Sequence, residues 1–390
     1  MSDIFLHSFN TLSHGLIGYV IPFLFVLTIV VFFHELGHFL VGRWAGVKVL
    51  TFSLGFGPEL FGFNDRHGTR WKVSAIPLGG YVKFFGDETE ASTPSAEALA
   101  HMTAEERDLS FHHKKVGPRA AIVAAGPIAN FLLAIVIFAC MFTFFGKPNT
   151  SARVDKIEAN SAAAAAGFQT GDIVTAIDGS KIETFSDMQR IVSGRAGEKL
   201  TFTVKRGETS LQLQGTPELR EVKDPFGNVQ RLGVLGITRQ TATGDVVTER
   251  VDPATAVWLG VKETWFVIDR TLAYISRIFT GRESADQVGG PLRIAQMSGQ
   301  VATIGLGALI QLAAVLSISI GLLNLFPVPL LDGGHLLFYT AEVLRGRPLS
   351  EKSQEYGFRV GLVLVLMLMV FAFYNDFHQV PWLKGLFGRS

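Results

Sequence analysis

Long apolar stretches alternate with segments of mixed polarity along this chain. A helix that spans a membrane needs roughly 20 predominantly apolar residues. Four stretches reach or approach that length, at residues 16–41, 120–145, 304–326 and 360–373. The last of them is short but almost purely apolar. The pattern predicts a polytopic α-helical membrane protein with about four transmembrane helices.

The segment between the first two apolar stretches has a different pattern. Residues 47–85 alternate β-forming side chains with glycines, as in Gly55-Phe56-Gly57. Strand-forming runs interrupted by glycine are typical of β-hairpins. We therefore expect a membrane-associated β-hairpin region inside an N-terminal membrane part that covers residues 1–146.

Residues 147–220 are predicted to form a small inserted α+β domain. An alanine-rich helix-forming run precedes strand-like runs such as residues 200–205. Residues 221–300 add a short β stretch and an amphipathic segment at residues 253–280, whose aromatic side chains could lie along a membrane surface. A C-terminal membrane part follows at residues 301–390.

Composition supports a membrane location. Of all residues, 48% are hydrophobic and 18% are charged, and the mean hydropathy is +0.32. Soluble domains carry about 25% charged residues. The net charge of +1 gives no basic field, so no nucleic-acid partner is expected. The single cysteine, Cys140, excludes an internal disulfide and a cysteine-based zinc finger, so a metal site must use His, Asp or Glu.

Basic residues beside the apolar stretches indicate an orientation. If the spans alternate in direction, the basic residues between the first and second spans and between the third and fourth fall on one side. They are Arg43, Lys48, Lys114, Lys115, Arg119, Arg345, Arg347, Lys352 and Arg359. Such residues accumulate on the cytoplasmic side, so both termini and residues 147–299 are predicted to face away from it. Lys384 and Arg389 run against this pattern. The first ten residues contain no Lys or Arg, so no cleavable signal peptide is expected.

The first apolar stretch carries the sequence His34-Glu35-Leu36-Gly37-His38 near its end. On a helix, His34 and His38 share one face, so their imidazoles can bind one zinc ion. Glu35 would then lie beside the metal-bound water. Ionisable groups inside a span are costly and usually functional. The alternative is that the histidines only join helices through hydrogen bonds, which would leave Glu35 in need of a buried partner.

A catalytic zinc site needs a third protein ligand, and Asp332 is the candidate. Pro327 and Pro329 break the helix at the end of the third apolar stretch. Two glycines after Asp332 allow close backbone packing, so a loop can present the Asp332 carboxylate beside the membrane. Two alternatives stay open: Asp332 caps a helix, or His335 is the ligand.

Together these motifs resemble the site-2 protease family, and within it the bacterial regulator of sigma-E protease group. The residues that carry the resemblance are His34-Glu35-Leu36-Gly37-His38, Leu331-Asp332-Gly333, Gly55-Phe56-Gly57-Pro58, Gly126-Pro127-Ile128-Ala129-Asn130-Phe131, Gly290-Pro291 and Asn324. The resemblance covers nearly the whole chain. It implies a Zn2+ metalloendopeptidase of the bacterial inner membrane that cleaves transmembrane segments of single-span proteins. The implied substrates are a site-1-trimmed anti-sigma factor or signal peptide remnants, as in regulated intramembrane proteolysis.

The inserted domain resembles a PDZ domain through Ala165-Ala166-Gly167-Phe168 and Gly171-Asp172. The best-known family members carry two tandem PDZ domains, whereas residues 218–251 are too short for a second one here. The domain could bind a carboxyl terminus, block bulky ectodomains or act as a spacer. With the predicted orientation it is extracytoplasmic.

The resemblance also implies roles at the site. Glu35 is expected to act as general base, while zinc polarises the scissile carbonyl. The substrate helix must unwind, and an exposed strand edge could then hold it by β-augmentation. The candidate edge residues are Phe52, Ser53, Leu54, Gly55, Phe56 and Gly57. Asn324 could bond that substrate strand or orient the site, or it could only join helices.

Two other classes of function remain open. An ion-coupled transporter could use the intramembrane His, Glu and Asp as an ion path, but the sequence shows no inverted repeats of the kind typical of that class. A membrane PDZ scaffold with an inactive metal site is the other class. The complete set of ligand and base residues speaks against it.

Overall fold

The computed structural model describes residues 2–87, 101–149, 151–223, 229–239, 247–281, 285 and 288–379. The chain forms two compact units. One, the membrane unit, consists of Met1–Ala139, Val257–Thr271 and Ser284–Ser390. The other, the inserted domain, consists of Cys140–Ala256 and Leu272–Glu283. Each unit has its own buried hydrophobic core.

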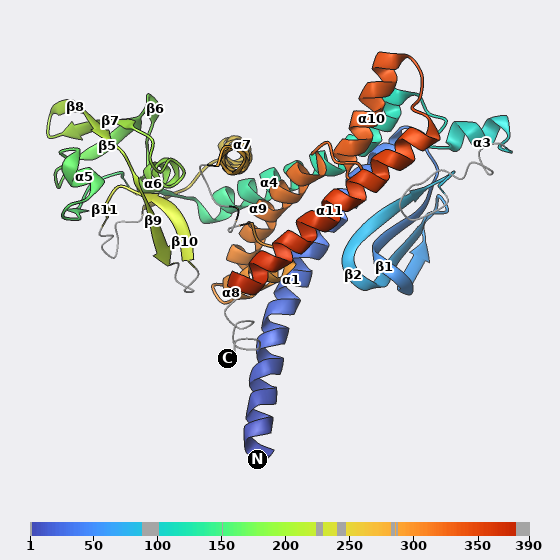
Figure 1. Cartoon of the computed structure of the whole chain (residues 1–390), viewed down its shortest axis with the longest axis horizontal. Helices are drawn as coiled ribbons and strands as arrows, with labels where there is room; N and C mark the ends of the chain where they lie inside the picture. The colour runs from blue at the N-terminus through green and yellow to red at the C-terminus, as the bar shows by residue number, and fades with distance from the viewer. Residues whose placement is uncertain are drawn as a thin grey trace. The chain divides into compact units, whose positions relative to one another are not determined.

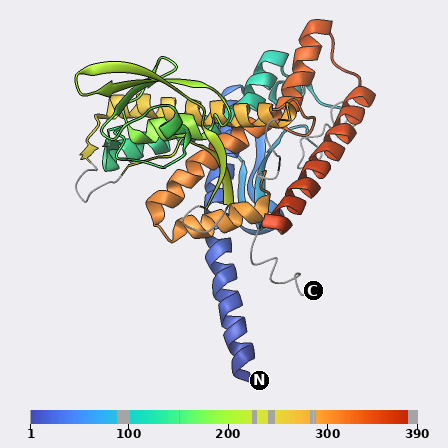
Figure 2. The same cartoon turned by 60° about the vertical axis from the view of Figure 1, so that its left-hand side comes forward.

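Among the described residues, four helices are long and apolar enough to cross a membrane, in agreement with the predicted number of spans. They are α1 (Ser2–Trp44), α4 (Val116–Phe145), α9 (Leu306–Asn324) and α11 (Glu351–Gln379) (Figure 1). The sequence pattern predicts the fourth span only at residues 360–373. The structure extends this span to Lys352–Phe377, because polar first turns that contain an Arg359–Glu355 pair continue the same helix. Figure 2 shows α11 as one uninterrupted helix.

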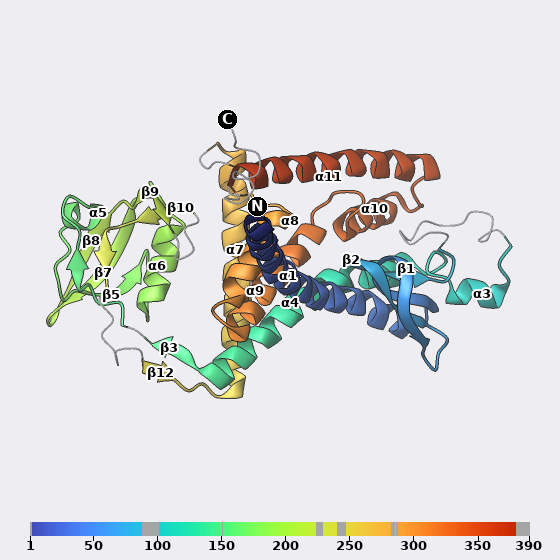
Figure 3. The same ribbon diagram turned by 90° about the horizontal axis from the view of Figure 1, so that it is seen from below.

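Helices α1 and α4 approach closely where two glycines remove side chains from the interface. A β-carbon added to Gly37 of α1 would overlap the carbonyl oxygen of Ala125 in α4. A β-carbon added to Gly126 of α4 would overlap Nε2 of His38 in α1. Helix α9 also packs against α1 (Figure 3), through a core cluster that includes Val26, Val30, Leu309 and Ala313. Helix α1 is thus packed against helices that are distant in sequence, and α8 (Pro291–Ala302) is a further one of them.

The β-hairpin region is an irregular antiparallel pair that packs against α1 (Figure 1), formed by β1 (Val49–Asn64) and β2 (Arg70–Phe84). Both ends of β2 pair with the first half of β1, so Phe52 lies opposite Trp71 and also opposite Val82. Residues 51–54 therefore run between two neighbouring segments. Residues 80–84 form an outermost strand among the residues that the structure describes.

Three further helices of the membrane unit are shorter: α3 (Ala104–Leu109), α8 (Pro291–Ala302) and α10 (Asp332–Arg345). The amphipathic segment predicted at residues 253–280 is confirmed as helix α7 (Pro253–Phe279), which contributes to both units. Helix α8 has no capping side chain of its own. Instead, buried Asp376 of α11 accepts hydrogen bonds from the backbone N–H groups of Gly290, Leu292 and Arg293. This carboxylate satisfies the first turn of α8 and joins α8 to α11.

The inserted domain is built on a four-stranded antiparallel sheet with the order β6-β5-β7-β8. Its elements are β5 (Ile173–Ile177), β6 (Ser180–Lys181), β7 (Leu200–Arg206), β8 (Thr209–Gly215) and the helices α5 (Ala162–Ala165) and α6 (Phe185–Ser193). Alternate positions of β7, namely Leu200, Phe202 and Val204, are buried in the domain core. Helix α6 buries Met188 and Val192 against the same core. The predicted α+β character is therefore confirmed.

The inserted domain continues beyond residue 220. Strand β11 (Ile237–Thr238) pairs with β4 (Lys156–Ile157), and β12 (Val247–Glu249) pairs with β3 (Lys147–Asn149). The hairpin of β9 (Glu218–Lys223) and β10 (Val229–Val234) also belongs to this unit. The predicted boundary at residue 220 is too early, because these short strands pair with partners far upstream that local patterns do not show.

Candidate metal centre

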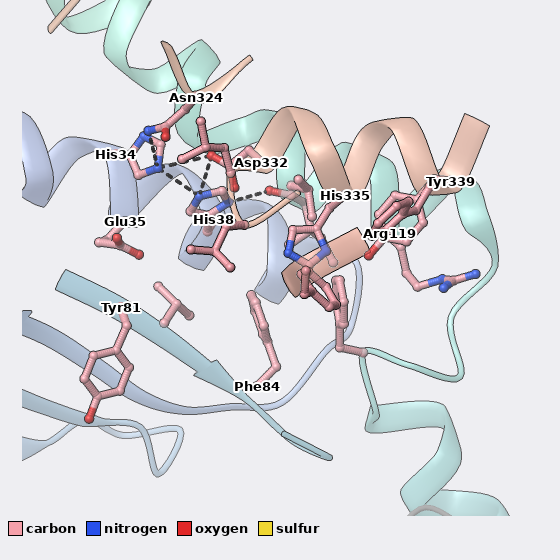
Figure 4. A pocket seen from close by; sticks show the side chains of 18 of the residues that line it. His34, Glu35, His38, Tyr81, Phe84, Arg119, Asn324, Asp332, His335 and Tyr339 are labelled. Atoms are coloured by element: carbon pink, nitrogen blue, oxygen red, sulfur yellow. Dashed lines mark hydrogen bonds and ion pairs between the residues drawn. The ribbon is translucent and has the colours of Figure 1, made fainter. Parts of the chain in front are cut away.

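Helix α1 directs two imidazoles toward one point. His34 and His38 lie one turn apart and are buried, each with 9% of its surface exposed. Their Nε2 atoms are 3.3 Å apart, and the two rings are nearly perpendicular at 85°. Figure 4 shows both rings beside Asp332. The two histidines therefore share a helix face, as their spacing predicts.

Asp332 reaches the same point from the first residue of α10. After α9 ends, the chain turns through two prolines and through Leu330, whose φ of 105° is unusual for a residue with a β-carbon. This turn places Oδ2 of Asp332 3.3 Å from Nε2 of His34 and 3.6 Å from Nε2 of His38. Asp332, the third predicted ligand, thus lies next to His34 and His38, although it is far from them in the sequence.

The three donor atoms have the spacing of metal ligands. Zinc ligands lie about 2.0–2.2 Å from the ion in a tetrahedron, which places neighbouring ligand atoms about 3.3–3.6 Å apart. The observed distances are 3.3, 3.3 and 3.6 Å. Oδ2 of Asp332 is buried and has no hydrogen-bond partner among the described residues. His34, His38 and Asp332 can therefore hold a metal ion, and this set of two imidazoles and one carboxylate suits zinc.

Helix α4 supplies a partner for the other nitrogen of each imidazole. Nδ1 of His38 lies 2.8 Å from the carbonyl oxygen of Ile122. A carbonyl can only accept, so Nδ1 donates and Nε2 keeps its lone pair for a metal. Nδ1 of His34 lies 3.3 Å from the side-chain amide of Asn130. Both rings are therefore oriented by α4.

His34, His38 and Asp332 are called the donor group below, since each offers an atom to a metal. His335, the alternative ligand, is not part of this group. It lies about one turn further along α10, lines the same cavity and faces the ring of Phe358. Burial lowers the pKa of His335, which favours the neutral imidazole. Burial acts to raise the pKa of Asp332, but the imidazoles of His38 and His34 in their protonated form outweigh it and hold the pKa below its ordinary value of 3.8. A bound metal ion would replace the ring protons as the positive partner of this carboxylate.

The donor group borders a cavity of about 440 Å³. Glu35 lines this cavity, and Figure 4 shows it on the β2 side of the two imidazoles. A β-carbon added to Gly80 would lie 3.0 Å from Cγ of Glu35, so β2 passes directly beside this side chain. Glu35 is not one of the three donor residues, so its carboxylate can exchange protons with a group bound in the cavity.

Asn324, the last residue of α9, also lies at this site. Its side-chain nitrogen is 3.5 Å from Nε2 of His34, and the residue lines the cavity. The sequence left open whether Asn324 bonds a substrate strand, orients the site or only joins helices, and the structure places it beside His34. Its amide can reach either the ligand sphere or a molecule bound in the cavity.

The strand edge predicted at residues 52–57 is not the strand that borders the cavity. The edge residues expected from the sequence, Phe52, Ser53, Leu54, Gly55, Phe56 and Gly57, do not line the cavity. Phe52 and Ser53 are buried, because residues 52–54 run between both ends of β2. The strand that borders the cavity is the 80–84 segment of β2. Its sequence signal is the glycine pair at residues 79–80, since adjacent glycines mark a close approach of backbone to other groups.

Comparison with known proteins agrees with this geometry. Residues 22–368 match the model of Peptidase family M50. A relative from Agrobacterium fabrum is 54% identical over 361 residues, which cover 93% of this chain and 96% of the relative, and carries the provisional name of zinc metalloprotease. Metalloprotease MmpA of Caulobacter vibrioides is 38% identical over 396 residues, which cover 96% and 99% of the two chains.

A solved structure resembles a part of the chain only slightly. It is the PDZ domain of the SdrC-like protein from Listeria monocytogenes, at 19% identity and a TM-score of 0.18. It covers 24% of this chain and 88% of its own.

The name of the Agrobacterium fabrum relative implies zinc, and the group of His34, His38 and Asp332 could bind such an ion. The family match favours neither the transporter nor the inactive scaffold. Spanning residues 22–368, and joined by relatives that align along nearly their whole length, it shows that the chain belongs to Peptidase family M50 and is a zinc metalloprotease.

Proposed function

We propose that the chain is an intramembrane endopeptidase of the bacterial inner membrane that cuts transmembrane segments of single-span membrane proteins. One observation carries this proposal. His34 and His38 of the donor group, and Glu35 beside them, lie on a helix that is apolar enough to span a membrane. A peptidase centre in that position acts on peptide bonds within or next to the bilayer.

The proposed zinc ligands are Nε2 of His34, Nε2 of His38 and Oδ2 of Asp332. Bound zinc would supply Lewis acidity, which polarises a peptide carbonyl and favours attack by water near neutral pH. The cavity beside the three donor atoms gives substrate and water access to them. The hydrogen bond to Ile122 supports the assignment of Nε2 as the donor atom of His38.

Glu35 is the proposed general base. Hydrolysis of an amide requires removal of a proton from water and delivery of a proton to the leaving amine. One carboxylate can perform both transfers in succession. The position of Glu35 supports this role, because it lines the cavity between the donor group and β2 without belonging to the donor group.

The substrate segment is proposed to pair with residues 80–84 of β2. A transmembrane helix satisfies its backbone groups internally, so it must unwind before a bond can be cut. Strand addition would replace those hydrogen bonds with bonds to β2. The contact between Gly80 and Glu35 supports this arrangement, because it brings a paired strand next to the base. Asn324 is proposed to bond the same segment from the other wall of the cavity.

The proposed substrates are single-span remnants left by an earlier cut, such as a site-1-trimmed anti-sigma factor or a signal peptide remnant. A cavity of about 440 Å³ is far too small for a folded domain, which supports prior trimming. The inserted domain is proposed to be a PDZ-like filter on the extracytoplasmic side. The charge pattern around the spans supports that placement.

Cleavage of single-span peptides by the purified chain tests the proposed function. The chain is reconstituted in lipid, and the products are located by mass spectrometry. We expect cuts within the apolar segment that stop when a chelator removes zinc and resume when zinc is restored. Cleavage that persists without metal, or cuts confined to water-soluble loops of the same peptides, would contradict the proposal.

The proposed orientation has a separate test. A reporter that is active only in the cytoplasm is inserted at Gly207, in the β7–β8 turn, where nothing crowds the backbone. The same reporter inserted at Gly68, in the β1–β2 turn, is the matched control. We expect activity at Gly68 and none at Gly207. The reverse pattern would place the inserted domain in the cytoplasm.

A further inference from the structure

The mechanism proposed above gives no role to Asn130. It lies on α4 and is completely buried, with 0% of its surface exposed. Its side-chain nitrogen is 3.3 Å from Nδ1 of His34, and its Oδ1 has no hydrogen-bond partner among the described residues. A buried amide oxygen without a donor is costly, so the position of Asn130 indicates that a donor belongs beside it.

Nδ1 of His34, when it carries the ring proton, can be that donor. Nε2 of His34 faces the other two metal-binding side chains, at 3.3 Å from Nε2 of His38 and 3.3 Å from Oδ2 of Asp332. An imidazole that offers Nε2 to a metal carries its proton on Nδ1. A half-turn of the Asn130 amide exchanges its oxygen and nitrogen and presents Oδ1 to that proton. In this orientation the hydrogen of Nδ1 and the oxygen of Asn130 are paired with each other.

His38 shows the same arrangement with a backbone acceptor. Its Nδ1 donates to the carbonyl oxygen of Ile122 at 2.8 Å. Helix α4 runs antiparallel to α1 here, since Ile122 meets His38 while Asn130 meets His34. One stretch of α4 thus provides an acceptor for each imidazole, one from the backbone and one from a side chain.

The backbone of Asn130 is fixed by α9. Ser317 donates its hydroxyl to the carbonyl oxygen of Asn130 at 2.9 Å. Gly321, one turn further along α9, allows the close contact, because a β-carbon there would lie only 3.1 Å from Cβ of Asn130. Asn130 therefore joins the helix of the two histidines to the helix that leads to Asp332. A side chain anchored in this way can hold a ring in one orientation.

We propose that Asn130 is a positioning residue that accepts the Nδ1–H of His34 and so holds the ring in the tautomer and orientation that direct the lone pair of Nε2 at the metal. The proposal rests on the zinc site proposed above. Groups that orient a ligating histidine typically change metal affinity by about 10–100-fold when they are removed. The same range is expected for removal of the Asn130 acceptor.

The zinc affinity of the purified full chain, measured by competition with a chromogenic chelator, tests the proposal. Asn130→Leu keeps the size but removes the acceptor, and we expect about a 10–100-fold loss of affinity. Asn130→Asp keeps an acceptor and should stay close to wild type. Ser319→Ala on the same helix as Ser317 is the matched control: it removes a hydroxyl that donates to the carbonyl oxygen of Val315 within α9, and it should bind zinc like wild type. Asn130→Ala, which adds no bulk, replaces the Leu variant if that variant does not fold.

A purely structural role for Asn130 predicts a different result. The Leu and Asp variants would then lower Tm alike while zinc affinity stays unchanged, which would overturn the proposal. Equal loss of zinc affinity in both variants would also overturn it, because the acceptor would not matter. His34→Ala separates the two levels of the argument. If it binds zinc as tightly as wild type, the proposed zinc site fails; if it loses zinc while Asn130→Leu does not, only the role of Asn130 fails.

Discussion

Gly126 presents bare backbone to His38. A β-carbon on Gly126 would overlap Nε2 of the His38 imidazole and would lie 2.9 Å from Cε1 of His34. Helix α4 can therefore reach both rings only because this position lacks a side chain. The same approach brings Ile122 and Asn130 within hydrogen-bond distance of the two histidines.

Gly126→Ala is predicted to weaken zinc binding. In an ordinary helix this change is stabilising by roughly 0.5–1 kcal/mol, but here the added methyl group must displace an imidazole. We expect about a tenfold or greater loss of zinc affinity. Gly117→Ala on the same helix, where nothing lies within 4 Å, is the control and should bind zinc normally. Chelator competition on both variants measures the difference, and equal affinities would refute the steric explanation.

Asp332 and His335 are predicted to respond differently to substitution. Asp332→Ala should lose zinc, because Oδ2 of Asp332 lies 3.3 and 3.6 Å from the two Nε2 atoms. His335→Ala should retain zinc, because His335 is outside the donor group. Metal content of the purified variants decides between them. Retention of zinc by the Asp332 variant together with its loss from the His335 variant would exchange their roles.

Gly80→Val is predicted to stop cleavage while zinc stays bound. A β-carbon there would lie 2.9 Å from Val31 and 3.0 Å from Cγ of Glu35, so β2 or Glu35 must move. Misplacement of a catalytic group by about 1 Å can cost about 10²-fold in rate. Gly18→Ala on α1, which faces open space, should cleave normally. Paired measurements of zinc content and kcat test this, and unchanged kcat in the Val variant would contradict it.

The inserted domain is predicted to lose stability in acid through Asp172. Burial acts to raise the pKa of this carboxyl, but hydrogen bonds from Arg206 and Gln169 outweigh it and hold the pKa below its ordinary value of 3.8. A lowered folded-state pKa stabilises the domain above about pH 4, and this contribution is lost as pH falls through the folded value.

Asp172→Asn tests that contribution in the full chain. The variant should destabilise the inserted domain by about 1.5–3 kcal/mol at neutral pH, because it removes a charged hydrogen-bond partner. Thermal unfolding of wild type and variant, at about pH 7 and about pH 2, should show a difference that shrinks in acid. A difference of equal size at both pH values would contradict the assignment.

The group of His34, His38 and Asp332 that could hold a metal ion could be predicted from the sequence, because its signals are local. His34 and His38 are one helical turn apart, and the prolines before Asp332 mark the end of a helix. The roles of Gly126 and Asn130 could not be predicted in this way. An apolar helix tolerates a glycine or an asparagine for several reasons, and only the packing of α4 against α1 shows which reason applies.

The strand edge at the cavity and the end of the inserted domain could not be predicted from local sequence patterns either. Residues 52–57 and 80–84 both have the composition of a strand, and only the double pairing of β1 shows which one is outermost. Strand β11 has two residues, and its pairing with β4 is a long-range contact. Register and sheet order depend on tertiary contacts that alternation along the chain does not encode.

Glu35→Gln tests the central claim most directly. Gln keeps the size and hydrogen-bonding capacity of the side chain but cannot act as a base, and base catalysis contributes about 10²–10⁴-fold. The variant should fold, bind zinc like wild type and cleave a single-span substrate slower by about that factor. Zinc content and the single-turnover cleavage rate are measured on the same preparation. Loss of zinc would make Glu35 a ligand, and near-normal cleavage with zinc retained would contradict the mechanism proposed for this metalloprotease.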